Sequence, residues 1–343
     1  MVRMHGRTKA AIASGIDFLL ARRGGDGLWR DFLTPAGEAS TWPSAYIGNA
    51  LQLAGAGSNA VDCTADALTL CQQPDGGWGY NEDTPSDADS TSWAILFLAR
   101  MPGHDSACHR AYTCLARHQR LSGGVATYAE SEPIRQYMGL GRWVPFRGWC
   151  RPQIEVSAAA GRALCALRSD VARASADAAW RYVKSRQNGD GSWNSYWWIS
   201  PHFATQQAVT LALSMRDPDP IRSAAAWVFN GQHHDGGWGL PGESEISSFA
   251  TALSLSVLAV SGLDYRRPIA GGIDALVGLQ QADGGWPSHP ALRIPLPADP
   301  SPAGDDRWRL IRFDPGIVVQ DQHRTFTSAT CVAALAHALR ATG

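Results

Sequence analysis

Residues 72–79 read QQPDGGWG, and the pattern of Gln, three residues, Gly, one residue and Trp returns along the chain. Three copies keep all three positions: RQNGDGSWN at 186–194, QHHDGGWG at 232–239 and QQADGGWP at 280–287. Two weaker copies are RRGGDGLW at 22–29, with Arg23 in the Gln position, and HQRLSGGV at 118–125, with Val125 in the Trp position. The last positions of the six copies are 49, 47, 68, 45 and 48 residues apart, a period that indicates a repeat architecture.

The sequence around each copy predicts a pair of helices. An Ala/Leu-rich segment with helical spacing precedes the pattern, and a polar loop and a more apolar helical segment follow it. The Asp-Gly-Gly turn is expected to C-cap the first helix, and Ser, Thr or Asp to N-cap the second. The expected first helices include 64–72, 174–187, 220–232 and 268–281, and the expected second helices are 40–53, 90–99, 156–167, 203–215, 247–260 and 325–339. Six such hairpins, about twelve helices, predict one all-α (α/α)6 toroid domain over residues 1–343, with the more apolar second helices inside.

Composition excludes several classes of protein. Hydrophobic residues make up 45% of the 343 residues and charged residues 18%, which suits a large core and not a disordered chain. The 30 basic and 31 acidic side chains nearly balance, so we expect no nucleic-acid partner. Seven cysteines without a CxxC pair favour a reducing, cytoplasmic location. No apolar run is long enough for a transmembrane segment, so membrane contact would be peripheral.

The repeated pattern resembles the QW motifs of the terpenoid cyclase and protein prenyltransferase superfamily, whose members fold as α/α toroids. The resemblance covers nearly the whole chain. In that superfamily the motifs tie the outer helices together and do no chemistry, so the resemblance implies a structural role for these Gln and Trp side chains. Chemistry is then expected in the loops just before the inner helices, because equivalent loops of all repeats lie at one end of the ring.

One of these junctions, DADSTSWA at 87–94, is similar to the D-x-D-D-T-A motif of class II terpene cyclases such as squalene-hopene cyclase. There the middle Asp protonates an alkene or epoxide. The match places Asp87 first, Asp89 as proton donor and Thr91 at the Thr, whereas Ser90 replaces the last Asp. Oxidosqualene cyclases also keep a single Asp in the donor place, in Asp-Cys-Thr-Ala-Glu. A second similar string, DCTAD at 62–66, precedes its repeat copy and is expected to N-cap an outer helix.

An aspartate protonates an alkene only if it is still protonated when substrate binds. Negative charge on Asp87, Glu155 and Glu245, together with apolar surroundings, would raise the pKa of Asp89. The helix N-terminus would lower it. The alternative is that Asp89 and Ser90 only cap the inner helix.

The other junctions predict the lining of the same basin. Four of the six carry a carboxylate and two a histidine, and aromatic residues lie beside them, which suits a cationic intermediate. The expected substrate-binding residues are Trp42, Trp93, Glu155, Trp197, Trp198, His202, Glu245 and His323. For the two histidines, metal binding, orientation of an acid or substrate, and ordinary structural hydrogen bonding are all open.

Two long loops, 126–152 and 287–320, are expected to close over the mouth of the ring. The first carries Arg147 and Arg151, which would grip a diphosphate unless they only solvate the loop. The second contains Asp305-Asp306-Arg307-Trp308-Arg309, but neither loop has a D-D-x-x-D motif at helical spacing. We therefore expect no cofactor, with Mg²⁺ needed only if the substrate is a diphosphate.

These features predict a compact class II-type cyclase, an isomerase or lyase in which Asp89 protonates the prenyl chain of a small apolar isoprenoid-like substrate. The resemblance implies a second helical domain beside the ring, so the long loops, an oligomer partner or a small substrate would have to complete the cavity. Two alternatives stay open. One is an acid–base or zinc-dependent transferase or lyase, with zinc on Cys150, His202, and His323 or Asp321. The other is a ring that binds a lipid or a partner protein without catalysis.

Overall fold

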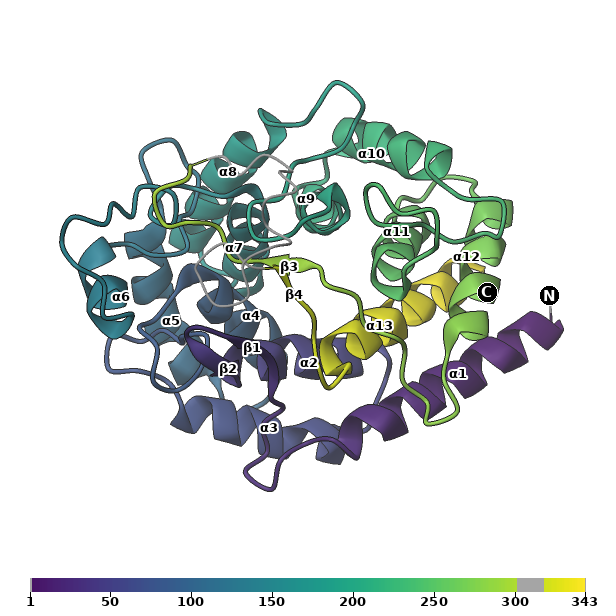
Figure 1. Ribbon diagram of the computed structural model, residues 1–343, viewed down its shortest axis with the longest axis horizontal. Coiled ribbons are helices and arrows are strands. Elements are labelled where there is room, and N and C mark those ends of the chain that lie inside the picture. The colour runs from purple at the N-terminus through teal and green to yellow at the C-terminus, as the bar shows by residue number, and fades with distance from the viewer. Residues whose placement is uncertain (1, 301–317, 343) are drawn as a thin grey trace.

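A computed structural model describes residues 2–300 and 318–342, whose helices form a ring of two concentric layers (Figure 1). The outer helices are α1 (Val2–Leu20), α3 (Ser58–Leu70), α5 (Asp105–His118), α8 (Asp170–Lys184), α10 (Pro218–Asn230) and α12 (Arg266–Leu279). The inner helices are α2 (Thr41–Leu53), α4 (Ala88–Leu98), α7 (Ile154–Ala166), α9 (Pro201–Met215), α11 (Ser248–Val260) and α13 (Thr325–Thr342). The predicted all-α ring of helical hairpins is confirmed.

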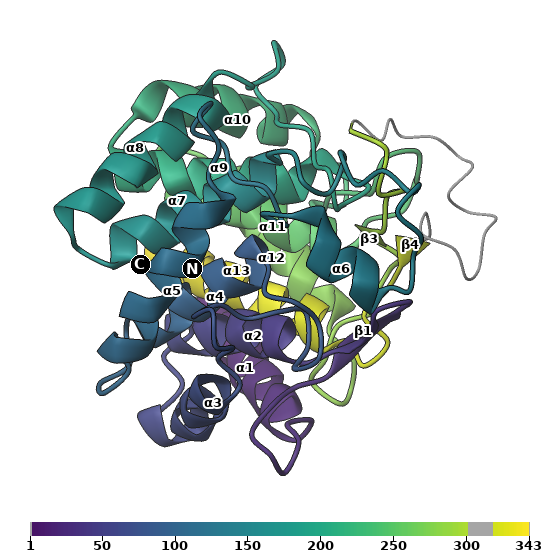
Figure 2. The same ribbon diagram turned by 90° about the vertical axis from the view of Figure 1, so that its left-hand side faces the viewer.

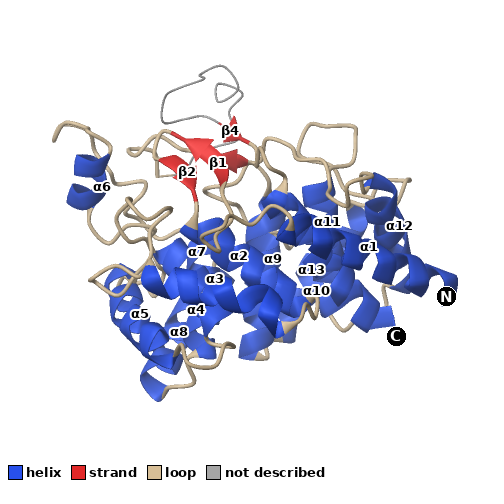
Figure 3. Ribbon diagram, turned by 90° about the horizontal axis from the view of Figure 1, so that it is seen from below, coloured by secondary structure: helices blue, strands red, loops and turns tan. Residues whose placement is uncertain are grey.

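Short elements that the sequence did not predict cover one end of the ring. They are the helix α6 (Ser131–Tyr137) and two antiparallel pairs of strands, β1 (Asp31–Thr34) with β2 (Gly37–Ala39) and β3 (Leu292–Arg293) with β4 (Val318–Val319). Figures 2 and 3 show them beyond the helices on the same side. Because the strands have four residues or fewer, they are too short for an alternating pattern. We call this end, where the inner helices begin, the mouth of the ring, and the opposite end its base.

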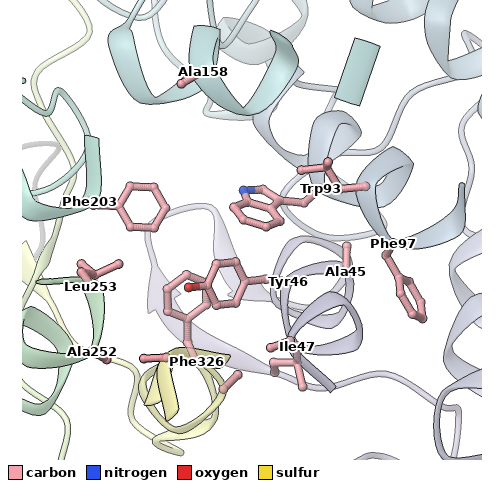
Figure 4. Close-up of a cluster of buried hydrophobic side chains, with 14 of the residues drawn as sticks. Ala45, Tyr46, Ile47, Trp93, Phe97, Ala158, Phe203, Ala252, Leu253 and Phe326 are labelled. Carbon is pink, nitrogen blue, oxygen red and sulfur yellow. The ribbon is translucent and has the colours of Figure 1, made fainter. Parts of the chain in front are cut away.

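The inner layer is apolar because it is covered from both sides. In α11, SFATALSLSVLAV, no residue is charged, and Ser248 to Leu258 are all buried. Its outward face packs against the outer helices, and its inward face meets side chains from across the ring. Figure 4 shows aromatic side chains of several inner helices, among them Tyr46, Trp93, Phe203 and Phe326, pointing towards the centre. Burial of both faces explains why the inner helices carry so few charged residues.

The Gln of each full repeat joins its own turn to the next outer helix. Gln72 Nε2 donates to Gly76 O at 2.7 Å and to Ala107 O in α5 at 2.8 Å. Gln119, Gln187, Gln232 and Gln280 make the same pair of bonds, and Arg23 donates to Ala60 O. The partner of Gln280 is Ala11 O in α1, so the last repeat closes the ring onto the first helix.

The glycines of the repeats do not C-cap the outer helices, and that prediction was wrong. α3 ends at Leu70 with Cys71 as its C-cap, whereas Gly76 lies further on, in the turn, with φ 91°. A Cβ at this position would lie 2.5 Å from Arg110 O, so the glycine lets the turn pack on the backbone of α5. The predicted N-caps are confirmed at Asp87, Ser200 and Ser247, whose side chains accept a backbone N–H in the first turn.

Replacing Gln280 with Ala removes both hydrogen bonds that join the last repeat to α1. We expect the free energy of unfolding to fall by about 1–3 kcal/mol, because two backbone carbonyls each lose a hydrogen-bond donor. Urea unfolding measures the change. Gln136→Ala, at an exposed position of α6, is the control and should leave the midpoint in place. Equal midpoints for both variants would contradict the ring-closing role of Gln280.

Candidate functional site

A cavity of about 100 Å³ lies at the mouth of the ring, next to the first turns of α2 and α4. Its walls are largely aromatic. The aromatic lining residues are Trp42, Tyr80, Tyr128, Trp149, Trp197 and Trp198, and the aliphatic ones include Ile134, Met138, Leu292 and Ile294. Asp87 and Asp89 are the only carboxylates among the described residues that line it. The cavity is therefore an apolar basin with acid groups on one side.

Asp89 lies in the first turn of α4 and faces this cavity. Protein surrounds it, although the cavity leaves part of its surface accessible. Its Oδ1 is buried and has no hydrogen-bond partner. Burial raises the pKa of Asp89 well above its usual range, and the negative charges of Asp87 and Glu155 raise it further. This shift favours the protonated carboxylic acid over the carboxylate.

Two indoles counteract this pKa shift in part. The N–H groups of Trp42 and Trp93 are close enough to Asp89 to lower its pKa, although neither Nε1 atom is aligned with a hydrogen-bond acceptor. Both indole N–H groups are buried without a partner. They would stabilise the carboxylate that is left after the acid gives up its proton.

Asp87, not Asp89, caps α4. Its Oδ1 accepts the N–H of Ser90 at 2.8 Å and its Oδ2 the Ser90 hydroxyl at 2.7 Å. Burial raises the pKa of Asp87 to about 6, and the bonds from Ser90 act against the shift. The alternative that Asp89 and Ser90 only cap the helix was therefore wrong. Asp87 holds the helix start in place, and Asp89, whose Oδ1 has no hydrogen-bond partner, faces the cavity.

Glu155 does not line the cavity but positions one wall of it. Its Oε1 accepts the backbone N–H groups of Tyr196 and Trp197, both at 2.6 Å. Burial raises the pKa of Glu155, whereas those two bonds and the nearby Arg293 guanidinium favour its charged form. Trp197 is fixed at its other end as well, because its Nε1 donates to Thr127 Oγ1 at 2.8 Å.

The aromatic wall consists of two packed groups of rings, one around Trp42 and Trp198 and the other around Trp149. Trp42 lies between the rings of Tyr80, at 6.0 Å, and Phe326, at 5.0 Å. Trp198 stacks on Phe326 at 5.5 Å, and Trp149 contacts Trp197 at 5.5 Å. Rings held in this way present fixed faces to the cavity, and an aromatic face attracts positive charge.

The two long loops meet across the mouth. Trp149 Nε1 donates to Pro295 O at 3.0 Å, and Gly148 N to Pro297 O at 2.8 Å. Met138 from the first loop and Ile294 from the second line the cavity. The predicted motif at 305–309 lies outside the described residues.

Five of the eight residues expected to bind substrate do not line the cavity: Trp93 and Glu155, described above, and three further residues. Glu245 is exposed, in the loop before α11. His323 is 54% exposed and pairs with Glu38 at 3.3 Å. His202 contacts Trp227 and hydrogen-bonds to Ser200, and burial lowers its pKa to about 4. These corrections have one cause: only part of each junction faces inward, and these three side chains point elsewhere.

The expected head-group and metal residues also lie outside the cavity. Arg147 and Arg151 are exposed, and Arg147 Nε donates to Ala298 O at 3.1 Å. Within residues 2–300 and 318–342, no three His, Cys, Asp or Glu side chains are grouped so as to hold a metal ion. The oxygens of Asp321 are bonded instead by Thr327 and Ser288. The zinc site considered from sequence is thus not assembled by Cys150, His202, His323 and Asp321.

The second DCTAD-type string lies on the outer helix α3, as predicted, but it does not cap that helix. The N-cap is Gly57, and residues 62–66 are in the helix interior. Thr64 Oγ1 donates to Gly27 O at 2.7 Å, on the side of the first repeat. No residue of this string lines the mouth cavity.

Sequence reasoning missed several lining residues. Tyr80 lies two positions after Trp78, in a turn that was assigned a structural role only. Met138, Leu292 and Ile294 belong to long loops whose path no helical period fixes. The signal that was available is the aromatic content of the first loop, which supplies Tyr128 and Trp149.

Comparison with known proteins adds to this picture. Residues 150–292 match the family model of the squalene-hopene cyclase C-terminal domain. A drimenyl diphosphate synthase from Streptantibioticus cattleyicolor is 30% identical over 285 residues, which are 76% of this chain and 48% of that protein. A squalene–hopene cyclase from Bradyrhizobium diazoefficiens is 26% identical over 320 residues, 81% of this chain and 47% of that one. The chain thus spans about half the length of these relatives.

A solved structure matches over its whole length. The type II terpene cyclase MstE from Scytonema, in complex with geranylgeranyl dihydroxybenzoate as substrate, has a TM-score of 0.90 and 28% identity, and the match covers 99% of this chain and 100% of that one. The wild-type apo form of the same cyclase matches with a TM-score of 0.89. A ring of this size therefore occurs among solved type II cyclases. On the repeats, the ring and these matches, the chain belongs to the terpenoid cyclase superfamily of α/α toroids, alongside the class II terpene cyclases.

Proposed function

We propose that the chain is a class II terpene cyclase, in which Asp89 protonates an alkene at the end of a prenyl chain and the mouth cavity guides the cation. The observation that carries the proposal is the buried, unbonded Asp89 Oδ1 at the edge of an aromatic cavity. Burial and the charges of Asp87 and Glu155 raise the pKa of this acid. A helix cap or a structural carboxylate would have hydrogen-bond donors, as Asp87 has.

The proposed reaction begins with transfer of the Asp89 proton to one alkene carbon, which leaves a tertiary cation on the other. A second alkene of the same chain attacks this cation, so that a carbon–carbon bond forms and the charge moves along the chain. The reaction ends when the cation loses a proton to a base or adds water, and solvent reprotonates Asp89. The product of the first route is an isomer of the substrate, and no redox partner is required.

Each wall of the cavity has a part in this scheme. Trp42 and Trp198 offer aromatic faces next to the acid, where the first cation forms. Asp87 and Glu155 act as positioning residues, because one fixes the start of α4 and the other the Trp197 segment. Trp93 stabilises the ionised acid and does not line the cavity.

The substrate is proposed to be an apolar isoprenoid-like molecule that enters with its alkene end first. Small-molecule sites usually occupy roughly 300–1,000 Å³, whereas this cavity has about 100 Å³, so it encloses only the end of a prenyl chain. The remainder would extend between the mouth loops. Arg147, whose Nε donates to Ala298 O of the second mouth loop, and the exposed Arg151 of the first loop would reach a charged head group there. If that group is a diphosphate, Mg²⁺ would offset its charge, with no metal needed otherwise.

The test is to incubate the purified protein with prenyl alcohols, prenyl diphosphates, prenylated aromatic acids and squalene, with and without Mg²⁺. Products are separated by chromatography and identified by mass spectrometry. We expect a cyclic isomer of unchanged mass or a hydrated cyclic product, with one deuterium incorporated from D₂O at the protonated carbon. Absence of turnover for every prenyl chain would refute the proposal and favour a binding ring.

Glu155→Gln is expected to shift the alkaline limb of the pH–rate profile to lower pH. Activity requires protonated Asp89, so it falls as pH rises through the raised pKa of this group. The Gln side chain keeps an oxygen for the two backbone N–H groups but removes a negative charge that raises that pKa. The maximal rate at low pH should change less than the position of the limb. An alkaline limb at the wild-type position would contradict the coupling.

A further inference from the structure

A second cavity, of about 170 Å³, lies inside the ring towards its base. All six inner helices line it with residues of their middle and second halves, and Arg100 follows the end of α4. We call it the lumenal cavity. Its most informative lining residues are Asn49, Arg100, Arg162, Gln206, Thr210 and His337.

Packed aromatic rings separate the two cavities. Phe326 contacts Trp42 of the mouth cavity at 5.0 Å and stacks on Tyr46 of the lumenal cavity at 3.9 Å (Figure 4). Tyr46 also contacts Trp93 at 4.6 Å. No described residue lines both cavities, although Trp93, whose indole N–H is close to Asp89, lines the lumenal one.

The lumenal cavity carries positive charge without a negative counter-charge. Arg100 and Arg162 line it, whereas no described lining residue is an Asp or Glu, and neither arginine forms an ion pair within the described chain. Arg162 contacts only neutral groups: it donates to Gln207 Oε1 and lies 5.3 Å from the centre of the Trp93 ring. Arg100 donates to Asn49 Oδ1 at 2.8 Å.

A buried guanidinium without a counter-charge is costly, so proteins normally pair such groups. Protein surrounds Arg162, although the cavity leaves part of its side chain accessible, and burial together with the Arg100 charge lowers its pKa to about 10. It is still charged at neutral pH. The backbone carbonyls at the ends of the inner helices offset part of this charge, but they supply only partial charges.

We propose that the lumenal cavity binds a small oxyanion, with inorganic phosphate as its simplest form, between the guanidinium groups of Arg162 and Arg100. Planar guanidinium groups match the oxygens of phosphate in pairs. Ser256 adds a hydroxyl group and Gln206 an amide group around the same space, whereas the Thr210 hydroxyl already donates to Gln206 O at 2.8 Å. A volume of about 170 Å³ holds several water molecules, so it holds one phosphate with some water. The half-exposed Arg100 marks the side open to solvent.

The pKa of His337 is expected to change when an anion binds in the lumenal cavity. Burial lowers its pKa to about 4, and the positive charges of Arg340, Arg162 and Arg100 contribute to that shift. No described acidic residue lines the cavity beside it. A bound anion would reverse this electrostatic balance and raise the pKa of His337.

The experiment measures phosphate binding by calorimetry and thermal melting at constant ionic strength, without any isoprenoid. We expect saturable binding to the wild type that is weakened about tenfold or more by Arg162→Met and by Arg100→Gln, because each removes charged hydrogen-bond donors. Arg181→Gln, on the exposed face of α8, is the matched control and should bind as the wild type does. Since Arg100 is at the solvent side, its variant tests the site even if Arg162→Met unfolds.

NMR titration of His337 gives an independent readout. Its signal, assigned with His337→Gln, should titrate at higher pH when phosphate is present, and this phosphate effect should be lost in Arg100→Gln. No binding to the wild type would overturn the proposal and leave the arginines as partners of the helix ends. Equal binding to the wild type and to both arginine variants would also overturn it. Neither result depends on whether Asp89 is a catalytic acid.

Discussion

The Asp89→Asn variant is expected to lose turnover by at least about 1,000-fold while it keeps its fold. The amide has nearly the same shape as the acid but no proton that it can transfer to an alkene. No hydrogen bond to Oδ1 is lost, because this buried atom has no partner. A buried acid with a strongly raised pKa also contributes nothing to stability in its charged form. Product analysis by mass spectrometry and thermal melts of both proteins test the two halves of this expectation.

The chain contains its own control for this experiment. Asp62 begins the second DCTAD-type string, but it is exposed on the outer helix α3. Asp62→Asn makes the same chemical change in a similar sequence, and we expect wild-type turnover. If Asp89→Asn retains turnover within a few-fold of the wild type, Asp89 is not the acid. If both variants lose activity, the loss comes from a disturbed fold and not from the missing acid.

The ring could be predicted from sequence because the contacts that specify it are local and recur in each repeat. Gln72 and Trp78 bond to backbone groups of their own repeat and its neighbour, and the same residues at the same spacing make the same contacts in all four full repeats. Helix starts followed from local capping residues such as Ser247. The role of Gly76 was misjudged because it depends on the approach of α5, a contact between repeats that no local pattern encodes.

The site was predicted only in part, for a related reason. Asp89 and Trp42 belong to the first turns of inner helices, so the position of the helix fixes where their side chains point. Glu245 and His323 precede the helices in irregular segments, and helical periodicity gives no direction there. Tyr80 is held at the cavity by its hydroxyl, which donates to Phe32 O at 2.5 Å, a contact between a turn and the strand β1, 48 residues apart. Residues on regular elements could be assigned, whereas those placed by tertiary contacts could not.

Trp78→Ala is expected to lower the free energy of unfolding by about 3–5 kcal/mol, the usual cost of removing a large aromatic side chain from a core. Trp78 is fully buried, and its Nε1 donates to Leu68 O at 2.7 Å, so the variant leaves a void and removes one of the donors to this carbonyl, which keeps the Cys71 N–H. Denaturant unfolding gives the change, and turnover per folded molecule should stay near the wild-type value because Trp78 does not line the mouth cavity. Trp143→Ala is the control, since this side chain is 86% exposed. Equal unfolding midpoints for Trp78→Ala and the wild type would contradict the structural role of the repeat. A lower midpoint with normal turnover would show that the residues that stabilise the ring are distinct from those that act at its mouth.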